Sequence, residues 1–129
     1  MGYGQGMKFI LDDSGKGHTI QRYDQGEVTV SNVVYRENCI VLPDRIISPW
    51  HPGDFLDLKT EDFSFLAELA AEIIILGTGA RQCFPHPGLT EPLMQRRIGL
   101  EVMDTAAACR TYNILMSEGR RVAVALFMI

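Results

Sequence analysis

The carboxyl-terminal half of the chain alternates short apolar runs with amphipathic segments. Four branched aliphatic residues at Ile73–Leu76 lead directly into Gly77-Thr78-Gly79, which predicts a strand buried on both faces that breaks into a tight loop. Further strands are predicted at Leu100–Met103 and Val122–Ile129. Helical spacing and capping residues predict three helices: Glu61–Glu72, a segment capped by Thr90 and closed by Gly99, and a segment from the Asp104 cap to about Ser117.

The amino-terminal half predicts an antiparallel meander of about three strands. Residues 18–23 and 27–30 alternate crudely between polar and apolar side chains, and the loop between them ends in a glycine, which favours a three-residue hairpin. A second turn at Glu37-Asn38 separates Val33–Tyr35 from Cys39–Leu42. A proline follows and is expected to end the meander, because proline cannot donate to a continuing ladder.

The whole chain, residues 1–129, is predicted to form a single α/β domain, because no repeat, linker or shift in composition divides it. The meander is expected to pack on one face or edge of a helix-covered sheet. That sheet is predicted to be parallel for at least its first pair of strands, since short strand–helix–strand connections favour right-handed crossovers. The glycine-rich residues 1–6 are expected to be flexible, and strand pairing is expected to begin at residues 7–10.

Composition narrows the class of protein. A hydrophobic fraction of 47% and a charged fraction of 22% are typical of a soluble globular domain. The net charge of −4 argues against nucleic acid as a partner, because phosphate binding needs a basic surface. The longest apolar run, Val122–Ile129, is far shorter than the roughly 20 residues of a membrane helix, so no integral membrane segment is expected. The start of the chain lacks the features of a signal peptide, and we expect a cytoplasmic protein.

Cysteine usage argues against a disulfide framework and against a metal site. Cys39, Cys83 and Cys109 are widely separated, and none forms a Cys-x-x-Cys pair or lies near a pair of histidines. Reduced thiols and no bound metal are therefore expected. No cofactor is predicted either, because Gly77-Thr78-Gly79 lacks the third glycine of a dinucleotide fingerprint and no Walker lysine follows it.

The Gly77-Thr78-Gly79 loop is nevertheless the first candidate site. In a parallel sheet the carboxyl ends of strands and the amino ends of helices share one edge, and ligands usually bind there. The loop amides, the Thr78 hydroxyl and the guanidinium of Arg81 could together surround a carboxylate or a phosphate. The alternative is a glycine loop that only turns the chain.

Arginines make a small anion a plausible ligand. Residues 1–72 hold 12 acidic and 6 basic residues, whereas residues 73–129 hold 4 acidic and 6 basic residues, and all of these last six are arginines. They either end helices and turns in solvent or converge on an anion.

Arg110 is the arginine of greatest interest, because its helix is expected to place it at the same sheet edge. The buried face of this helix is expected to consist of Ala107, Ala108, Ile114 and Leu115, so the guanidinium should be partly buried and in need of acceptors. Those acceptors are loop carbonyls or an acid such as Glu101, or else an anionic ligand. The neighbouring side chains of Tyr112 and Asn113 have the same two interpretations.

A cysteine enzyme is a weaker hypothesis. Cys83 or Cys109 with His86 or His51 would supply a thiol and a base, but such a site needs geometry that the sequence does not give. Cys109 stands beside alanines and is expected to be a core thiol. No pair of carboxylates falls in a plausible cleft, so no catalytic residue is predicted and catalysis is not favoured.

Several segments together resemble a family of small single-domain proteins that includes the mitochondrial respiratory complex I assembly factor 3. The segments are Ile75–Gly79, Gly99–Thr105, Ala107–Leu115 and Glu118–Arg120 before an Ala/Val/Leu strand, with Arg-Thr-Tyr-Asn at residues 110–113 the most specific part. The resemblance covers most of residues 18–129. It implies a three-layer α/β domain with a mixed central sheet, flanking helices and an additional antiparallel β part, in which the last strand runs antiparallel to its neighbours.

Two functions therefore lead. The resemblance and the lack of a catalytic constellation favour a non-enzymatic interaction or assembly module that binds an unidentified protein partner, with a homo-oligomer left open. The second hypothesis is a binding domain for a small anion at Gly77, Thr78, Gly79, Arg81 and Arg110, with Tyr112 and Asn113 nearby.

Overall fold

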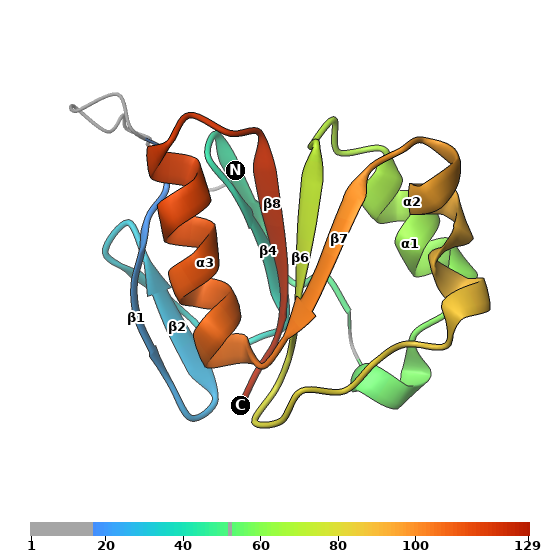
Figure 1. The fold of residues 1–129 in the computed structure, drawn as a ribbon. Coiled ribbons are helices and arrows are strands. Elements are labelled where there is room, and N and C mark those ends of the chain that lie inside the picture. The colour runs from blue at the N-terminus through green and yellow to red at the C-terminus, as the bar shows by residue number, and fades with distance from the viewer. Residues whose placement is uncertain (1–16, 52) are drawn as a thin grey trace.

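The last strand, β8 (Val122–Phe127), lies at the centre of a five-stranded sheet, and all six of its residues are buried. The computed structural model describes residues 17–51 and 53–129, and its large sheet has the strand order β5-β4-β8-β6-β7 (Figure 1). The partners of β8 in this sheet are β4 (Cys39–Leu42), β5 (Arg45–Ile47), β6 (Ile73–Thr78) and β7 (Gly99–Met103). A central place suits β8, because a strand without polar side chains needs cover on both faces.

The large sheet is mixed. Strand β6 runs parallel to both β7 and β8, so that Leu76 faces Val102 on one side and Ala125 on the other. Strand β4 is antiparallel to β8 and to β5. The predicted parallel pair of β6 and β7 is confirmed. The antiparallel direction expected for the last strand is right with respect to β4 and wrong with respect to β6.

Among the described residues, a second sheet consists of the three strands β1 (Ile20–Asp24), β2 (Glu27–Val30) and β3 (Val33–Tyr35), which pair antiparallel in sequence order. The hairpin predicted around residues 24–26 is confirmed, but its loop has two residues and not three, because Asp24 pairs with Glu27. Gly26 in this loop has the positive φ of 74° that the turn needs. The prediction that Cys39–Leu42 continues this meander is wrong. All four of its side chains are buried, so this segment pairs inside the large sheet instead, where both faces are covered.

Three α-helices and two short 3₁₀ helices cover the large sheet. Their bounds are η1 (Phe55–Asp57), α1 (Thr60–Ala67), η2 (Pro87–Thr90), α2 (Glu91–Gln95) and α3 (Thr105–Ser117). The cap predicted at Asp104 is confirmed, because its carboxylate accepts a hydrogen bond of 2.8 Å from the amide of Ala107. The first two helices are shorter than predicted.

The predicted ends of α1 and α2 need correction. Lys59, not Thr60, is the N-cap residue of α1, and the helix stops at Ala67 because Ala70 adopts a left-handed backbone with φ 62°. Thr90 stands at the N-cap of α2 but makes no capping bond with its side chain. Gly99 belongs to β7 and does not end α2.

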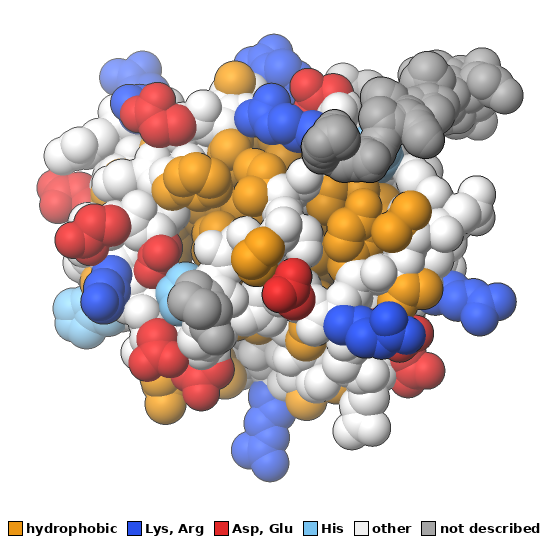
Figure 2. Space-filling view, turned by 180° about the vertical axis from the view of Figure 1, so that it is seen from behind, with side chains coloured by type: hydrophobic (Ala, Val, Ile, Leu, Met, Phe, Trp, Pro, Cys, Tyr) orange, Lys and Arg blue, Asp and Glu red, His pale blue; other side chains and the backbone are white. Residues whose placement is uncertain are grey.

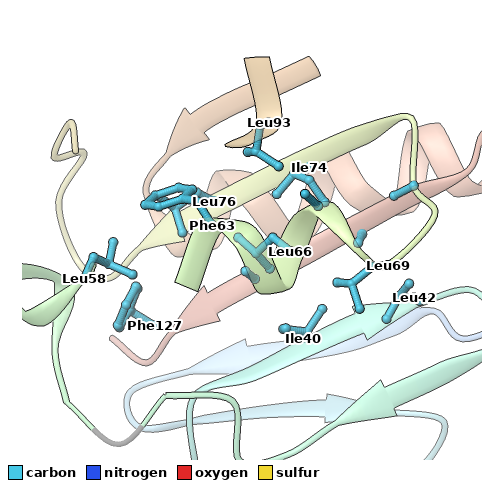
Figure 3. Close-up of a cluster of buried hydrophobic side chains, with 14 residues drawn as sticks. Ile40, Leu42, Leu58, Phe63, Leu66, Leu69, Ile74, Leu76, Leu93 and Phe127 are labelled. Atoms are coloured by element: carbon cyan, nitrogen blue, oxygen red, sulfur yellow. The ribbon is translucent and has the colours of Figure 1, made fainter. Parts of the chain in front are cut away.

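The two faces of the large sheet carry two separate cores. Helices α1 and α2 cover one face, and α3 with the small sheet covers the other, which gives three layers (Figure 1). Because strand side chains alternate, Ala125 and Phe127 enter the first core whereas Val124 and Leu126 enter the second. The first core is built around Phe63, where α1 side chains meet those of three strands (Figure 3).

The buried face of α3 differs from the predicted one. Its buried residues are Thr105, Ala108, Cys109, Tyr112 and Met116. Of the predicted set only Ala108 is fully buried, and Ile114 is 58% exposed. The small sheet packs beside α3, and Tyr112 lies in the core that the two share. The buried face of α3 is therefore centred on Tyr112 and not on Ile114.

The exposed surface is mixed in character. Seen from behind, apolar side chains gather over the middle of the molecule, and basic side chains lie along its upper edge (Figure 2). Among the described residues, none of the helices has the length and hydropathy needed to cross a membrane. The expectations for residues 1–6 and 7–10 lie outside the described residues.

Close packing at Gly77 predicts that a larger side chain at this position lowers the stability of the protein. A Cβ atom at Gly77 would lie 2.9 Å from Leu126 Cδ2 and 3.1 Å from both Ala108 Cβ and Thr105 Oγ1. The change Gly77→Ala should therefore lower the free energy of unfolding by about 1–3 kcal/mol in urea denaturation, because it overpacks a core between α3 and β6.

A matched control lies on the neighbouring strand. At Gly99 the nearest atoms would be 3.7 and 3.8 Å from an added Cβ, which is ordinary contact. The change Gly99→Ala should leave the urea midpoint unchanged or raise it slightly. Equal losses of stability in the two variants would contradict the packing described for β6.

Candidate functional site

The Thr78 side chain is occupied by protein groups. Its hydroxyl donates to the carbonyl oxygen of Arg81 and lies 3.3 Å from that of Met103. The same oxygen accepts a hydrogen bond of 3.1 Å from the amide of Cys83. Thr78 is buried, so these bonds satisfy a group that would otherwise be costly to bury, and they close the chain into a turn after β6.

Gly79 is likewise bonded within the protein. Its amide donates to Thr105 Oγ1 over 2.8 Å, its carbonyl accepts from the Thr105 amide over 2.9 Å, and Thr105 Oγ1 in turn donates to the carbonyl of Phe127 over 2.6 Å. Thr105 therefore ties together the carboxyl ends of β6 and β8 and the start of α3. The polar atoms expected to hold an anion are used to join three elements at this sheet edge.

The arginines do not converge. Arg81 is exposed, and Arg110 is also exposed rather than partly buried as predicted. Nη1 of Arg110 donates to the Tyr23 hydroxyl over 2.8 Å, so the side chain reaches β1 and neither Glu101 nor the Gly77–Gly79 loop. Two further arginines of residues 73–129 form ion pairs: Arg96 with Glu68 at 2.7 Å and Arg120 with Glu72 at 3.1 Å.

The segment Arg110–Asn113 instead holds the small sheet. Asn113 bonds both backbone groups of Ile20, because Nδ2 donates to its carbonyl over 2.8 Å and Oδ1 accepts from its amide over 2.9 Å. One residue earlier, the hydroxyl of Tyr112 donates to the carbonyl of His18 over 2.7 Å. Three of the seven predicted site residues, Arg110, Tyr112 and Asn113, thus bond to β1 or to the residues just before it. These partners lie about ninety residues away in the chain.

The hydrogen bonds of Tyr112 and Asn113 affect stability because the groups that they join are buried. Tyr112 is fully buried, and this burial raises the pKa of its phenol, so the hydroxyl stays protonated and able to donate. Ile20 is buried as well, and its backbone groups would lose water without gaining a partner if Asn113 were absent. The structural interpretation of Tyr112 and Asn113 has direct support, and an anion-binding role for the seven residues stays a prediction without such support.

Two of the three thiols are buried, and both candidate histidines bond to other protein groups. Cys109 and Cys39 are buried, and burial raises the pKa of each thiol to about 12, so neither is a ready nucleophile at neutral pH. Nδ1 of His86 accepts from the amide of Gly88 at the start of η2. No cluster of His, Cys, Asp and Glu in the described ranges 17–51 and 53–129 could hold a metal ion.

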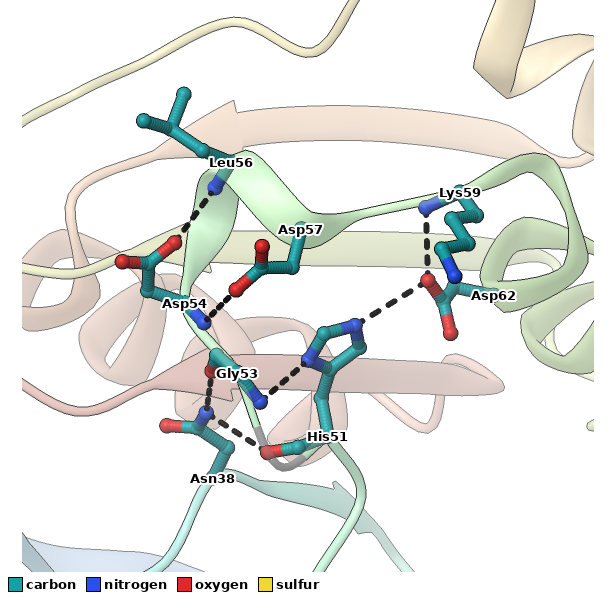
Figure 4. A network of polar contacts seen from close by, with 8 residues as sticks. All are labelled: Asn38, His51, Gly53, Asp54, Leu56, Asp57, Lys59 and Asp62. Atoms are coloured by element: carbon teal, nitrogen blue, oxygen red, sulfur yellow. Dashed lines mark hydrogen bonds and ion pairs between the residues drawn. The ribbon is translucent and has the colours of Figure 1, made fainter.

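Sequence reasoning missed a network around Asn38 and His51. Nδ2 of Asn38 donates to the carbonyls of His51 and Gly53 over 2.9 and 2.8 Å (Figure 4). Its Oδ1 accepts from the amide of Met128 over 2.9 Å. Asn38 therefore fastens the loop before η1 to the end of β8. The sequence showed Asn38 only as a turn residue, because its partners are distant in the chain.

His51 is a buried structural histidine. Its Nδ1 accepts from the amide of Gly53 over 3.1 Å, so the proton resides on Nε2, which faces Oδ2 of Asp62 at 3.3 Å (Figure 4). Its ring also packs edge-on against Trp50 and Phe127. Both ring nitrogens are thus engaged, and Trp50 is half-buried against Phe127, as expected of a residue that closes a core.

A hollow of about 550 Å³ lies at the opposite end of the sheet from the Gly77–Gly79 loop. It is bordered by the β4–β5 turn, the turn after α1 and the turn between α3 and β8. Arg120 at the rim of this hollow forms an ion pair with Glu72. Hydrogen bonds from the amide of Arg121 and from the guanidinium of Arg120 hold the pKa of the Glu72 carboxyl below its usual value. The pattern of strands and loops did not predict a hollow here, because ligand sites are expected at the carboxyl ends of parallel strands.

Fold and contacts define a three-layer α/β domain whose inner polar side chains chiefly join its own segments. Over residues 20–127 the chain matches the family described as "Protein of unknown function (DUF498/DUF598)", and it belongs to that family. The sequence-based resemblance is thereby confirmed at the level of the family.

Curated relatives include an assembly factor of the respiratory chain. The chain is 36% identical over 122 residues to NADH dehydrogenase (ubiquinone) 1 alpha subcomplex assembly factor 3 of Danio rerio, covering 93% of this chain and 70% of that protein. It is 38% identical over 90 residues to the Mus musculus protein of the same name, covering 68% of this chain but only 48% of that protein. An uncharacterised Rhodobacter capsulatus protein is 33% identical, with 83% and 82% covered.

Solved structures share the fold. A crystal structure of a Bordetella parapertussis protein superposes with a TM-score of 0.81 at 37% identity, covering 87% of this chain and 96% of the other. An NMR structure of a Xanthomonas campestris protein superposes with a TM-score of 0.79 at 32% identity, covering 99% and 92%. The predicted α/β architecture of a mixed sheet with an added antiparallel part is confirmed by the structure and by these neighbours.

The two hydrogen bonds from Asn113 to Ile20 of β1 predict that one substitution at Asn113 lowers the stability of the protein. The change Asn113→Ala should lower the free energy of unfolding by about 2 kcal/mol, because it leaves the amide and the carbonyl of Ile20 without partners. Hydrogen exchange of the β1 amides should also become faster relative to those of β8. Both can be measured on one sample, by urea denaturation and by mass spectrometry of the exchanged protein.

Thr111→Ala is the matched control, because Thr111 lies on the same helix turn, is half-buried and has no side-chain bond among the described residues. It should leave β1 exchange unchanged. If Asn113→Ala left stability and β1 exchange at the values of the control, the segment 110–113 would not hold the small sheet.

Proposed function

We propose that the chain acts as a non-enzymatic assembly module that binds protein subunits of respiratory complex I during their assembly. The observation that carries this proposal is the identity of 36% to complex I assembly factor 3 of Danio rerio over 93% of the chain. Because the match extends over both sheets and all three helices, a shared folded surface is available for a related task.

The site geometry supports a binding role more than a catalytic one. The buried thiols have raised pKa values, the polar groups of the Gly77–Gly79 loop bond to the protein, and the ring nitrogens of His51 are engaged. Four large apolar side chains, in contrast, lie exposed around α1 and α2, as expected of a protein with partners.

Deletion of the gene in its own host is the test of this function. We expect the amount of assembled complex I, measured by native electrophoresis and NADH oxidation in membranes, to fall severalfold. The full chain supplied from a plasmid should restore it, and so should the Gly99→Ala variant, whose packing is undisturbed.

A second readout identifies direct binding. The chain with a tag at its amino end, isolated from growing cells, should bring down NADH dehydrogenase subunits in more than background amounts. Unchanged complex I in the deletion strain, together with no enrichment of these subunits, would refute the proposed function.

A further inference from the structure

The outer surface of α1 presents one large apolar side chain between two acids. Phe63, Leu66 and Ala67 face the core, and the exposed stripe at helical spacing consists of Glu61, Ser64, Phe65 and Glu68. Phe65 is 44% exposed although an apolar residue at this position gains nothing from contact with water. Its place between two carboxylates gives the helix an outer face that is apolar at the centre and acidic at both ends.

Helix α2 repeats the arrangement. Leu93 is buried, whereas Glu91, Met94 and Gln95 are exposed, and Met94 is 68% exposed. Methionine is flexible and polarisable, and such residues are frequent on surfaces that bind partners. Each of two adjacent helices therefore contributes one exposed apolar side chain beside an acid.

The two helices are held side by side. Nη1 of Arg96 donates to the carbonyl of Ala67 over 3.1 Å, and its Nη2 donates to Glu68 over 2.7 Å. These bonds join the end of α2 to the end of α1, so the two exposed stripes have a fixed relation. A surface that is already ordered binds a partner at a lower cost in conformational entropy.

Two further exposed apolar residues belong to chain segments next to these helices. Leu56 of η1, which precedes α1 by a few residues, is 87% exposed, and Phe84, just before η2, is 71% exposed. The side of the molecule occupied by α1 and α2 carries several acidic side chains beside apolar ones (left in Figure 2). We name the outer side chains of Leu56, Phe65, Phe84 and Met94 the helical-layer surface.

Charge indicates what this surface accepts. Every charged residue within η1, α1, η2 and α2 is acidic, namely Asp57, Glu61, Asp62 and Glu91. Basic residues occur only beside these elements, and Arg96 is already paired with Glu68. A partner that covers the apolar centre must therefore bring positive charge to the rim, because opposite charges across an interface steer and orient association.

We propose that the helical-layer surface binds an amphipathic helix of a partner protein whose apolar side chains meet Phe65 and Met94 and whose flanking residues are Lys or Arg. A helix suits the surface, because an amphipathic helix presents a row of apolar side chains with charged residues beside it, which matches exposed Phe65 and Met94 next to Glu61 and Glu91. The proposal deepens the assembly role and rests on it for the existence of a protein partner.

The test uses a phage-displayed library of single helices randomised on one face, selected against the full chain. Enriched helices should carry Leu, Phe or Met flanked by Lys or Arg. A synthetic enriched peptide, followed by fluorescence anisotropy, should bind the Phe65→Asp/Met94→Asp double variant at least tenfold more weakly than the unchanged chain. Glu61→Lys/Glu91→Lys should weaken binding at least threefold and reduce its dependence on salt.

Ile114→Asp is the matched control, because Ile114 is 58% exposed on α3, on the opposite face of the large sheet (Figure 1). It should bind the peptide like the unchanged chain, and all variants should keep their thermal midpoints within a few degrees, since the side chains replaced are exposed. The proposal is overturned by enriched helices without basic residues, by undiminished binding to the Phe65/Met94 variant, or by no enrichment.

Two further measurements on the same samples test whether something other than a partner helix occupies the helical-layer surface. If the chain forms a dimer in sedimentation at the concentrations used and the Phe65/Met94 variant is a monomer, a second copy covers the surface and the proposal is wrong. If vesicles of phosphatidylcholine and phosphatidylglycerol displace the peptide, the surface binds lipid and the proposal is also wrong.

Failure of the surface and failure of the assembly role are distinguishable. A Phe65→Asp/Met94→Asp chain that restores complex I as well as the unchanged chain refutes the surface and leaves the assembly role intact. Selective peptide binding together with normal complex I in the deletion strain refutes the assembly role and leaves the surface intact.

Discussion

All six residues of β8 are buried at the centre of the large sheet, so every other layer has to cover or pair with this strand. It pairs with β4 on one side and β6 on the other, and its alternating side chains enter both cores. A strand with six apolar residues cannot be left at an edge, so the helices and the small sheet must cover both of its faces. Its end is fastened twice, where Thr105 donates to the carbonyl of Phe127 and Asn38 accepts from the amide of Met128.

Polar side chains around β8 join distant segments of the chain through hydrogen bonds. Asn113 holds Ile20 of the small sheet, Asn38 holds the loop before η1, and Thr105 holds the turn after β6, each through backbone groups far away in the chain. An amide or hydroxyl that satisfies buried backbone groups is costly to lose, whereas its own contribution is modest. Much of the polar chemistry that first indicates a ligand site therefore joins the layers of the domain.

The sequence predicted those features that depend on local patterns. The strand before Gly77, the first hairpin, the Asp104 cap and a central last strand followed from side-chain periodicity and turn residues. The pairing of Cys39–Leu42 did not, because a short apolar segment fits either sheet until its distant partners are known. Arg110 and Asn113 show the same limit, since only the tertiary structure decides whether a polar side chain meets a ligand or a protein group about ninety residues away. Periodicity predicts the buried face of α1 at Phe63, Leu66 and Ala67, but it does not show what covers Phe65 on the outer face.

We propose that partners contact the α1–α2 layer, whereas the Gly77–Gly79 loop and α3 serve the fold. Hydrogen exchange of the chain, alone and bound to the partner isolated with it, distinguishes these two roles. We expect slower exchange in peptides covering residues 60–68 and 90–97, and unchanged exchange in those covering 77–81 and 105–117. Slower exchange confined to residues 77–81 and 105–117, with none in α1 and α2, would contradict it.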